Sequence, residues 1–184
     1  MKNYLFIGLI LGLFVACEKS TDPFMITTNS VGFLTDSTMI KELKTVFTND
    51  SLSTYIGGDE FTGSTNTISV YEKTTGTLLL ELDPNYSLDS LSTIRTVRVM
   101  DPRFMNQDGL NTLSTFGDIN TKYQISSIQN TLRSLIISVD EINAYFTLSK
   151  TELPEEMRYN MNSKIEAISI PETAKIKDFY LQWY

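Results

Sequence analysis

A single cysteine restricts the ways in which this chain can be held together. Cys17 is the only cysteine among 184 residues, and no histidine occurs anywhere. One cysteine cannot form a disulfide within the chain, so the fold must be stabilised by packing of apolar side chains. The same composition excludes Ser-His-Asp and Cys-His catalytic systems, zinc sites built from histidine and cysteine, and haem ligation by either residue. Carboxylate chemistry, Ser-Lys chemistry and oxygen-ligated cations remain.

The position of this cysteine predicts where the protein resides. A short basic start, Met1-Lys2-Asn3, is followed by an apolar run from Tyr4 to Ala16 and then directly by Cys17. This is the layout of a secretory signal, and the run is shorter than the roughly 20 apolar residues of a membrane-spanning helix. The string Phe14-Val15-Ala16-Cys17 resembles a bacterial lipobox, in which the cysteine thiol is acylated and becomes the new N-terminus. We therefore expect a signal peptide over 1–16 and a palmitate-bearing lipoprotein anchored through Cys17; an ordinary signal peptide with a chance cysteine is the alternative.

Charge narrows the possible partners. Lys2 would leave with the signal peptide, so the mature chain would carry 14 basic and 22 acidic residues and a net charge of −8. Binding to nucleic acid needs clustered lysine and arginine residues, and electrostatic binding to anionic lipid needs them as well. We therefore expect no nucleic-acid partner. Membrane attachment is expected through acyl chains on Cys17, which hold a protein stably when there are two or more. The expected location is the cell envelope, on the periplasmic face or at the outer membrane.

The first half of the chain predicts one helix followed by three strands. Apolar residues spaced for one helical face predict a helix over 39–47, with the face formed by Ile40, Leu43, Val46 and Phe47. Residues 55–66 hold three of the nine glycines and predict a loop. Alternating segments bounded by turn residues then predict strands at 67–72, 78–82 and 94–100.

The second half repeats this order. A helix is predicted over 113–123, where Phe116, Ile119 and Tyr123 follow the residues Ile40, Leu43 and Phe47 at a constant offset of 76 positions. Strands are predicted at 134–139, 144–148 and 164–170, and an extra strand at 175–183.

These patterns predict an α+β fold in which an antiparallel sheet carries two helices on one face. Two interpretations are open: a tandem pair of helix-β-β-β modules that share a continuous sheet, or a single α+β domain with two helices by chance. In the tandem interpretation, residues 17–30 form a lipidated tether, 31–104 the first module and 105–184 the second. A first edge strand at 24–27 is the alternative to an unstructured tether.

One stretch resembles an element found in small bacterial envelope proteins. Residues 109–119, GLNTLSTFGDI, lead to Tyr123 and resemble a glycine-containing loop and capped helix that precede an antiparallel sheet. Outer-membrane assembly lipoproteins of the BamE type and β-lactamase inhibitor proteins use versions of this element. The whole chain is also similar to uncharacterised lipoproteins of Bacteroidota, in Cys17 and in the segments 31–35, 101–104 and 145–150. The resemblance implies an envelope lipoprotein and brings no activity with it.

Ordinary turn and surface roles explain the candidate chemical motifs. Asp83-Pro84 and Asp101-Pro102 could pair two carboxylates for acid–base work, but Asp-Pro is also common turn chemistry. Asp101, Asp108 and Asp118 could offer oxygens to calcium, but they lack EF-hand spacing. The glycine-rich segment 57–64 lacks the Lys-Ser/Thr ending of a P-loop. We therefore predict no catalytic residue, no metal site and no cofactor.

The solvent-facing side of the predicted sheet is the best candidate for a contact surface. Alternation along the strands places Tyr71, Tyr145, Tyr180 and Arg98 opposite the apolar residues. Tyrosine and arginine are enriched in protein interfaces, although tyrosine also simply favours strands. We expect a non-catalytic envelope lipoprotein that binds a protein or other envelope ligand. The alternatives are a carboxylate-dependent enzyme acting on glycans and a structural accessory subunit without a ligand of its own.

Overall fold

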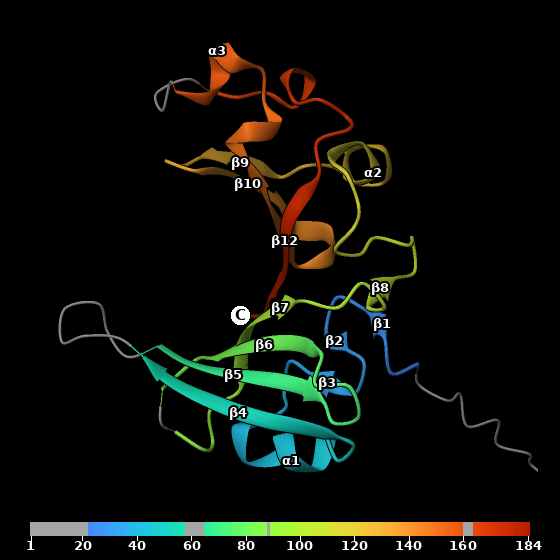
Figure 1. Cartoon of the computed structure of the whole chain (residues 1–184), viewed down its shortest axis with the longest axis vertical. Coiled ribbons are helices and arrows are strands. Elements are labelled where there is room, and N and C mark those ends of the chain that lie inside the picture. Colours follow the sequence, from blue (N-terminus) through green and yellow to red (C-terminus); the bar gives the residue numbers. More distant parts are fainter. Residues whose placement is uncertain (1–21, 58–64, 88, 160–163) are drawn as a thin grey trace, which may run out of the picture.

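An eight-stranded antiparallel sheet forms the body of the molecule (Figure 1). The computed structural model describes residues 22–57, 65–87, 89–159 and 164–184, and no helix in these ranges is long and apolar enough to cross a bilayer. The strand order is β4-β5-β6-β7-β12-β11-β10-β9. The strands are β4 (Asp50–Gly57), β5 (Thr65–Glu72), β6 (Leu78–Pro84), β7 (Ile94–Val99), β9 (Ser127–Asn130), β10 (Ser134–Val139), β11 (Ala144–Ser149) and β12 (Ile176–Gln182).

A second sheet of very short strands and several short helices accompany the large sheet. The small sheet has the order β3-β2-β1-β8 and is made of β1 (Met25–Ile26), β2 (Ser30–Val31), β3 (Leu34–Thr35) and β8 (Met105–Asn106). The α-helices are α1 (Leu43–Val46), α2 (Phe116–Lys122) and α3 (Glu155–Arg158). Short 3-10 turns are η1 (Ile40–Glu42), η2 (Asp140–Ile142), η3 (Lys150–Glu152) and η4 (Ala167–Ser169).

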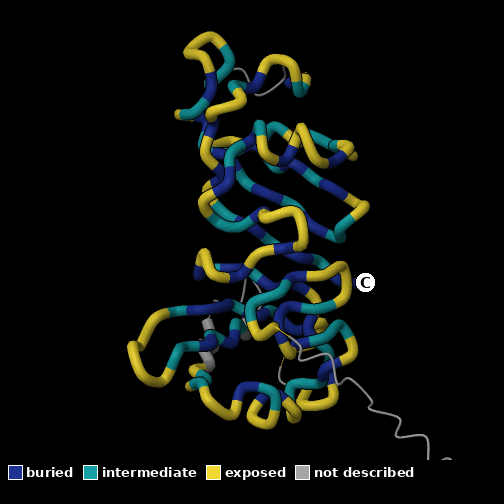
Figure 2. Tube along the Cα trace, turned by 90° about the vertical axis from the view of Figure 1, so that its right-hand side faces the viewer, coloured by how far each residue is buried: buried dark blue, intermediate teal, exposed yellow. Residues whose placement is uncertain are grey.

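One face of the large sheet is apolar across its whole width. The strand register aligns one row of apolar residues over all eight strands: Leu52, Val70, Leu80, Val99, Phe179, Phe146, Ile137 and Ile128. The buried helix residues Leu43, Phe116 and Ile119 join the same core cluster, so α1 and α2 cover this face. Seen from the side of α2 and the small sheet, buried and half-buried residues alternate along the strands (Figure 2). The α+β class with helices on one face is therefore confirmed.

An acidic side chain caps the start of both predicted helices. The Thr115 side chain accepts a hydrogen bond from the backbone N–H of Asp118, whose carboxylate accepts one from the N–H of Thr115 at 2.8 Å. At the other helix, the carboxylate of Glu42 accepts a hydrogen bond from the Met39 N–H at 2.9 Å. These contacts satisfy backbone donors that the first helical turn leaves free.

The strands of both halves differ from the prediction. The first helix is followed by four strands of the large sheet rather than three, because β4 was missed, and in the second half β9 was missed while the strand at 164–170 was predicted in error. The loop predicted at 55–66 is too long, because β4 (Asp50–Gly57) ends within it and β5 begins at Thr65. β9 has a single apolar residue, Ile128. The predicted strand at 164–170 is wrong: its described residues include the 3-10 turn η4. The strands predicted at 67–72, 78–82, 94–100, 134–139 and 144–148 are confirmed, and 175–183 is β12.

The segment assigned to the tether belongs in part to the fold. β1 pairs in parallel with β8, and Ile26 is buried in the core. A strand therefore forms within 24–27, because burial of Ile26 stabilises pairing that the polar composition of 18–30 did not suggest. It is not an edge strand, because β1 lies between β2 and β8. The arrangement of β4–β7 and β9–β12, joined through β7 and β12, is what two modules sharing one sheet would give. Their common origin stays a prediction.

Candidate functional site

The face opposite the core carries a continuous polar row. Side chains alternate between the two faces of a strand, so the residue next to each member of the apolar row points the other way. We call these residues the polar row: Ser53, Ser69, Glu81, Arg98, Tyr180, Tyr145, Ser138 and Ser127, in order across the sheet. Its three largest side chains lie together on the central strands β7, β12 and β11, and serines flank them toward both sheet edges.

Arg98 is held by two carboxylates in the middle of this row. Its guanidinium lies 2.7 Å from Glu81 Oε2 and 2.6 Å from Asp178 Oδ1. Asp178 also accepts a hydrogen bond from the Thr147 hydroxyl at 2.6 Å. Burial opposes the charge of Arg98, but the hydrogen bonds to Asp178 and Glu81 outweigh it and raise its pKa above the usual value. Arg98 is therefore a fixed cation in a defined orientation.

Two tyrosines stack beside this cation. The rings of Tyr145 and Tyr180 lie 4.6 Å apart between centroids, with planes only 9° from parallel. The guanidinium carbon of Arg98 lies 5.8 Å from the Tyr180 ring centroid, within cation–π range. Burial, followed by proximity to Tyr180, raises the pKa of Tyr145 to about 12, and burial raises the pKa of Tyr180 as well. Both phenols therefore stay neutral at physiological pH and can donate hydrogen bonds.

The stack separates two hollows on the polar face. One has a volume of about 310 Å³ and is lined by Thr67, Ser69, Glu81, Asp83, Arg98 and Tyr180. The other has a volume of about 220 Å³ and is lined mainly by Ser138, Asp140, Asn143, Tyr145, Gln182 and Tyr184. The small serines of the polar row leave this space beside the larger side chains. A ligand on this face would meet two stacked rings with a recess on either side.

The structure brings three of the four predicted contact residues together. Arg98, Tyr145 and Tyr180 are neighbours in register. Tyr71 lies on the same face by alternation but two positions beyond Ser69, where the register shifts and Tyr71 pairs with Leu78. Glu81 completes the group and was not predicted, although its position between the buried residues Leu80 and Leu82 was a usable signal.

The two Asp-Pro segments do not form a carboxylate pair. Asp83 pairs with Thr96 near the start of β7 and accepts a hydrogen bond from the Thr67 hydroxyl at 2.7 Å. Asp101 lies beyond the other end of β7, where its backbone N–H bonds to the Leu79 carbonyl. The antiparallel pairing of β6 with β7 therefore places the two aspartates at opposite ends of β7.

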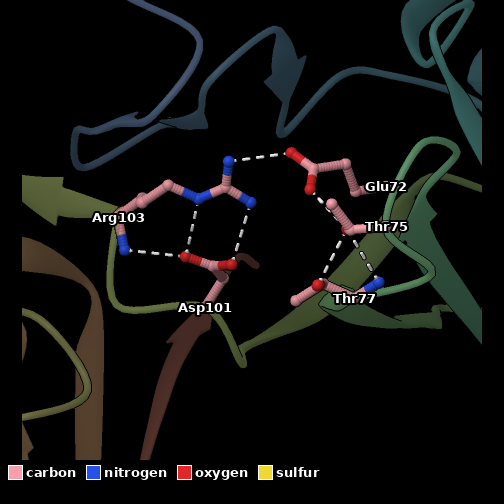
Figure 3. Close-up of polar contacts among 5 residues, drawn as sticks. All are labelled: Glu72, Thr75, Thr77, Asp101 and Arg103. Atoms are coloured by element: carbon pink, nitrogen blue, oxygen red, sulfur yellow. Dashed lines mark hydrogen bonds and ion pairs between the residues drawn. The ribbon is translucent and has the colours of Figure 1, made fainter.

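Asp101 instead anchors a cluster of charged side chains around Arg103 (Figure 3). Its Oδ1 accepts bonds from the Arg103 backbone N–H at 2.9 Å and from Nε at 3.0 Å, and its Oδ2 lies 2.9 Å from Nη2. Arg103 also bonds to Glu72 at 2.8 Å and lies over the ring of Phe24. The hydrogen bond from Arg103 lowers the pKa of Asp101. The turn interpretation of this segment is therefore correct, and the cluster ties β1, the β5–β6 turn and the end of β7 together.

The other acidic candidates are engaged in local contacts as well. Asp118 caps α2, and Asp108 accepts a hydrogen bond from the Tyr123 hydroxyl. Within the described ranges, no group of three or more metal-binding side chains comes together. Cys17 and residues 58–64 of the glycine-rich segment lie outside the described residues.

Comparison with known proteins establishes a likeness of fold. No protein-family model matches the chain, and no curated protein gives a significant match. The chain is similar in structure to the uncharacterized protein yfeY from Escherichia coli, with a TM-score of 0.59 and 15% sequence identity. The match covers 86% of this chain and 99% of yfeY, so nearly the whole architecture is shared. At this identity the likeness concerns the fold alone.

Proposed function

We propose that this protein is a non-catalytic lipoprotein of the cell envelope that binds an envelope protein through its polar row. The anchor would be acylated Cys17, as the sequence predicts. The observation that carries the proposal is the stack of Tyr145 and Tyr180 beside the ion-paired Arg98, with a recess on each side. These residues hold large amphipathic surfaces in fixed orientations on rigid strands.

Such an arrangement suits binding because the side chains already have fixed orientations before a partner binds. Immobilising flexible side chains costs roughly 0.5–1.5 kcal/mol each on association. The ion pairs of Arg98 and the mutual stacking of the tyrosines reduce that cost. Tyrosine and arginine are also the residues that most often dominate binding energies at protein interfaces.

The contacts of the carboxylates favour binding over hydrolysis of glycans. Glycoside hydrolysis uses two carboxyl groups that face each other across the substrate. Glu81 and Asp178 instead both bond to the same guanidinium, and Asp83 accepts the hydroxyl of Thr67. The glycan-acting enzyme stays the alternative, and the accessory subunit without a ligand is the third candidate.

The test compares partner recovery after cross-linking in membranes. The protein carrying both Tyr145→Thr and Tyr180→Thr keeps strand-favouring residues but loses the stack. We expect recovery of the cross-linked partner to fall at least tenfold while the protein stays folded. Tyr86→Thr is the matched control, because Tyr86 is 71% exposed and lies outside the polar row.

Each alternative gives a different result. Unchanged recovery with the double variant would place the contact elsewhere and contradict the proposal. Absence of any cross-linked partner with the unaltered protein would contradict both the proposal and the accessory subunit. Release of sugar from envelope glycans by the purified protein, abolished by Glu81→Gln, would support the enzyme.

A further inference from the structure

A further cavity, separate from the two hollows of the polar face, lies on the apolar side of the large sheet. It has a volume of about 510 Å³ and lies between the small sheet and the apolar face at β11 and β12. Its apolar lining consists of Met25, Ile26, Ile142, Ala144, Phe179 and Leu181. Protein interiors have few voids larger than a water molecule, whereas binding pockets for small molecules have volumes of about 300–1,000 Å³. The volume of this cavity is therefore in the range of small-molecule binding pockets.

The floor of the cavity contains one small residue. A second apolar row crosses the sheet, formed by Ile68, Leu82, Val97, Leu181, Ala144 and Val139. Every member except Ala144 carries a branched side chain, and Ala144 lines the cavity. A larger apolar residue there would fill space and bury more area, which usually stabilises a protein. Folding alone therefore gives no reason for alanine at this position.

The roof of the cavity, formed by residues 25–32, is held by hydrogen bonds as well as by the burial of Ile26 and Val31. The Thr28 carbonyl, in the turn between β1 and β2, accepts bonds from Trp183 Nε1 at 3.0 Å and from Asn143 Nδ2 at 3.4 Å. On its other side β1 pairs with β8. The roof is thus tied to the large sheet on one side and to β8 on the other, so the cavity is formed before any ligand enters.

The polar groups around the cavity indicate the charge of its ligand. Thr27, Thr28, Ser30, Asn106 and Gln107 also line it and offer hydroxyl, amide and backbone groups. None of its lining residues is lysine or arginine, while Asp22 is among them. An anionic head group would find no cation to pair with and would face a carboxylate. A hydroxyl-bearing head would find hydrogen-bond partners.

We propose that this cavity binds an uncharged amphiphile, with its apolar chain against Met25, Ile142 and Ala144 and its hydroxyl head at the polar residues. The class includes acylglycerols and fatty alcohols. The site lies on the sheet face opposite the polar row and does not depend on the function proposed for that row.

The experiment uses residues 18–184, which contain every described element, and the uncharged fluorescent probe N-phenyl-1-naphthylamine. We expect the protein to bind the probe and monoolein to displace it at a concentration at least tenfold lower than oleate does. The graded variants Ala144→Val and Ala144→Ile should weaken probe binding progressively, by at least tenfold for Ala144→Ile, with an unchanged or raised Tm. Tyr86→Thr is the control, because Tyr86 is exposed and lies outside both the cavity and the polar row, and this variant should bind the probe normally.

Several results would overturn the proposal. These are absence of probe binding, equal binding by the Ala144 series, or displacement by oleate as readily as by monoolein. Ala144→Val keeps the test decisive should Ala144→Ile fail to fold. If the acylated full-length protein in nanodiscs excludes a probe that residues 18–184 bind, the chain on Cys17 fills the cavity and a free ligand is the wrong occupant.

Discussion

Leu43 and Ile119 occupy equivalent positions in two helices that lie 76 positions apart in the sequence. The Leu43 carbonyl accepts the N–H of Phe47 at 2.8 Å, and the Ile119 carbonyl accepts that of Tyr123 at 2.9 Å. The backbone N–H of the first residue of each helical segment also donates a hydrogen bond. In both cases the acceptor is a carbonyl just before the last strand of the same half. Ile40 bonds to the Ser92 carbonyl at 2.9 Å, and Phe116 bonds to that of Ala174 at 2.8 Å. The offset of 76 positions thus relates not only the apolar residues of the two helices but also their backbone hydrogen bonds, which the sequence does not reveal.

Truncation of either residue should destabilise the protein strongly. Leu43 is 1% exposed and Ile119 is fully buried. Replacing such residues by alanine removes apolar burial and leaves a cavity, which costs about 2–5 kcal/mol. Denaturant unfolding of Leu43→Ala and Ile119→Ala should show losses in this range. Ile168→Ala is the control, because Ile168 is 91% exposed. A loss below about 0.5 kcal/mol at either buried site would mean that its helix does not cover the core.

The stacked tyrosines should stabilise each other measurably. A double-mutant cycle with Tyr145→Thr and Tyr180→Thr removes each ring singly and both together. Aromatic pairs of this geometry contribute about 0.5–1.5 kcal/mol beyond their buried area, so we expect a coupling free energy of that size in thermal or denaturant unfolding. The same cycle between Tyr71 and Tyr145 should give additive effects, because Tyr71 lies away from the stack. Additivity at the first pair would show that the rings do not stack in solution.

Acid should weaken the contribution of Asp101 to stability. Its pKa in the folded protein lies below the unfolded value of about 3.9, chiefly because Arg103 donates hydrogen bonds to the carboxylate. A group with a lowered folded pKa stabilises the protein above its unfolded pKa, and the stabilisation is lost as the pH falls through the folded pKa. The free energy of unfolding of Asp101→Asn should therefore differ most from that of the unaltered protein above about pH 5. This difference should shrink below about pH 4.

Arg103→Gln provides the control for this titration. Without the guanidinium, replacing Asp101 by asparagine should change stability with much less dependence on pH. A difference between the aspartate and asparagine proteins that stays constant from neutral pH to pH 2 would show that the ion pair does not form.

The anchor predicts a simple fractionation result. Cys17→Ser removes the thiol that would be acylated, so the protein should be released from membranes or accumulate with its first 16 residues uncleaved. Fractionation after washing with high salt and mild alkali measures the first outcome, and the molecular mass measures the second. A serine variant that is processed and still remains with membranes to the same extent would exclude an acyl anchor.

The sequence predicted most strands of the large sheet, and its polar side, because both depend on local alternation. Tyr145 and Tyr180 could each be placed on the solvent-facing side from their own strands. Their stacking could not be predicted, because it depends on the pairing of β11 with β12. A long irregular segment separates these two strands in the sequence, so no local pattern indicates that they pair. The ion pairs of Arg98 depend on two further pairings for the same reason.

Weak local signals account for the elements that were missed. The glycines at 57, 58 and 63 favoured a loop over the last residues of β4, and β9 has only Ile128 to place against the core. The cavity near Ala144 was also beyond local reasoning, because its roof comes from β1 and its floor from β11 and β12. Long-range pairing, rather than residue preference, determines these features.

The central position of β12 sets the order in which this molecule can fold. Residues 176–182 are the last strand along the sequence, yet they lie between β7 and β11. A chain that stops before Ile176 leaves both of these strands with unpaired edges, which are prone to pair with other chains. The continuous sheet therefore cannot form while synthesis of the strands before β12 is still under way. Closure of the sheet therefore waits for the end of the chain, and loss of the last strand would leave two exposed edges in place of one continuous sheet.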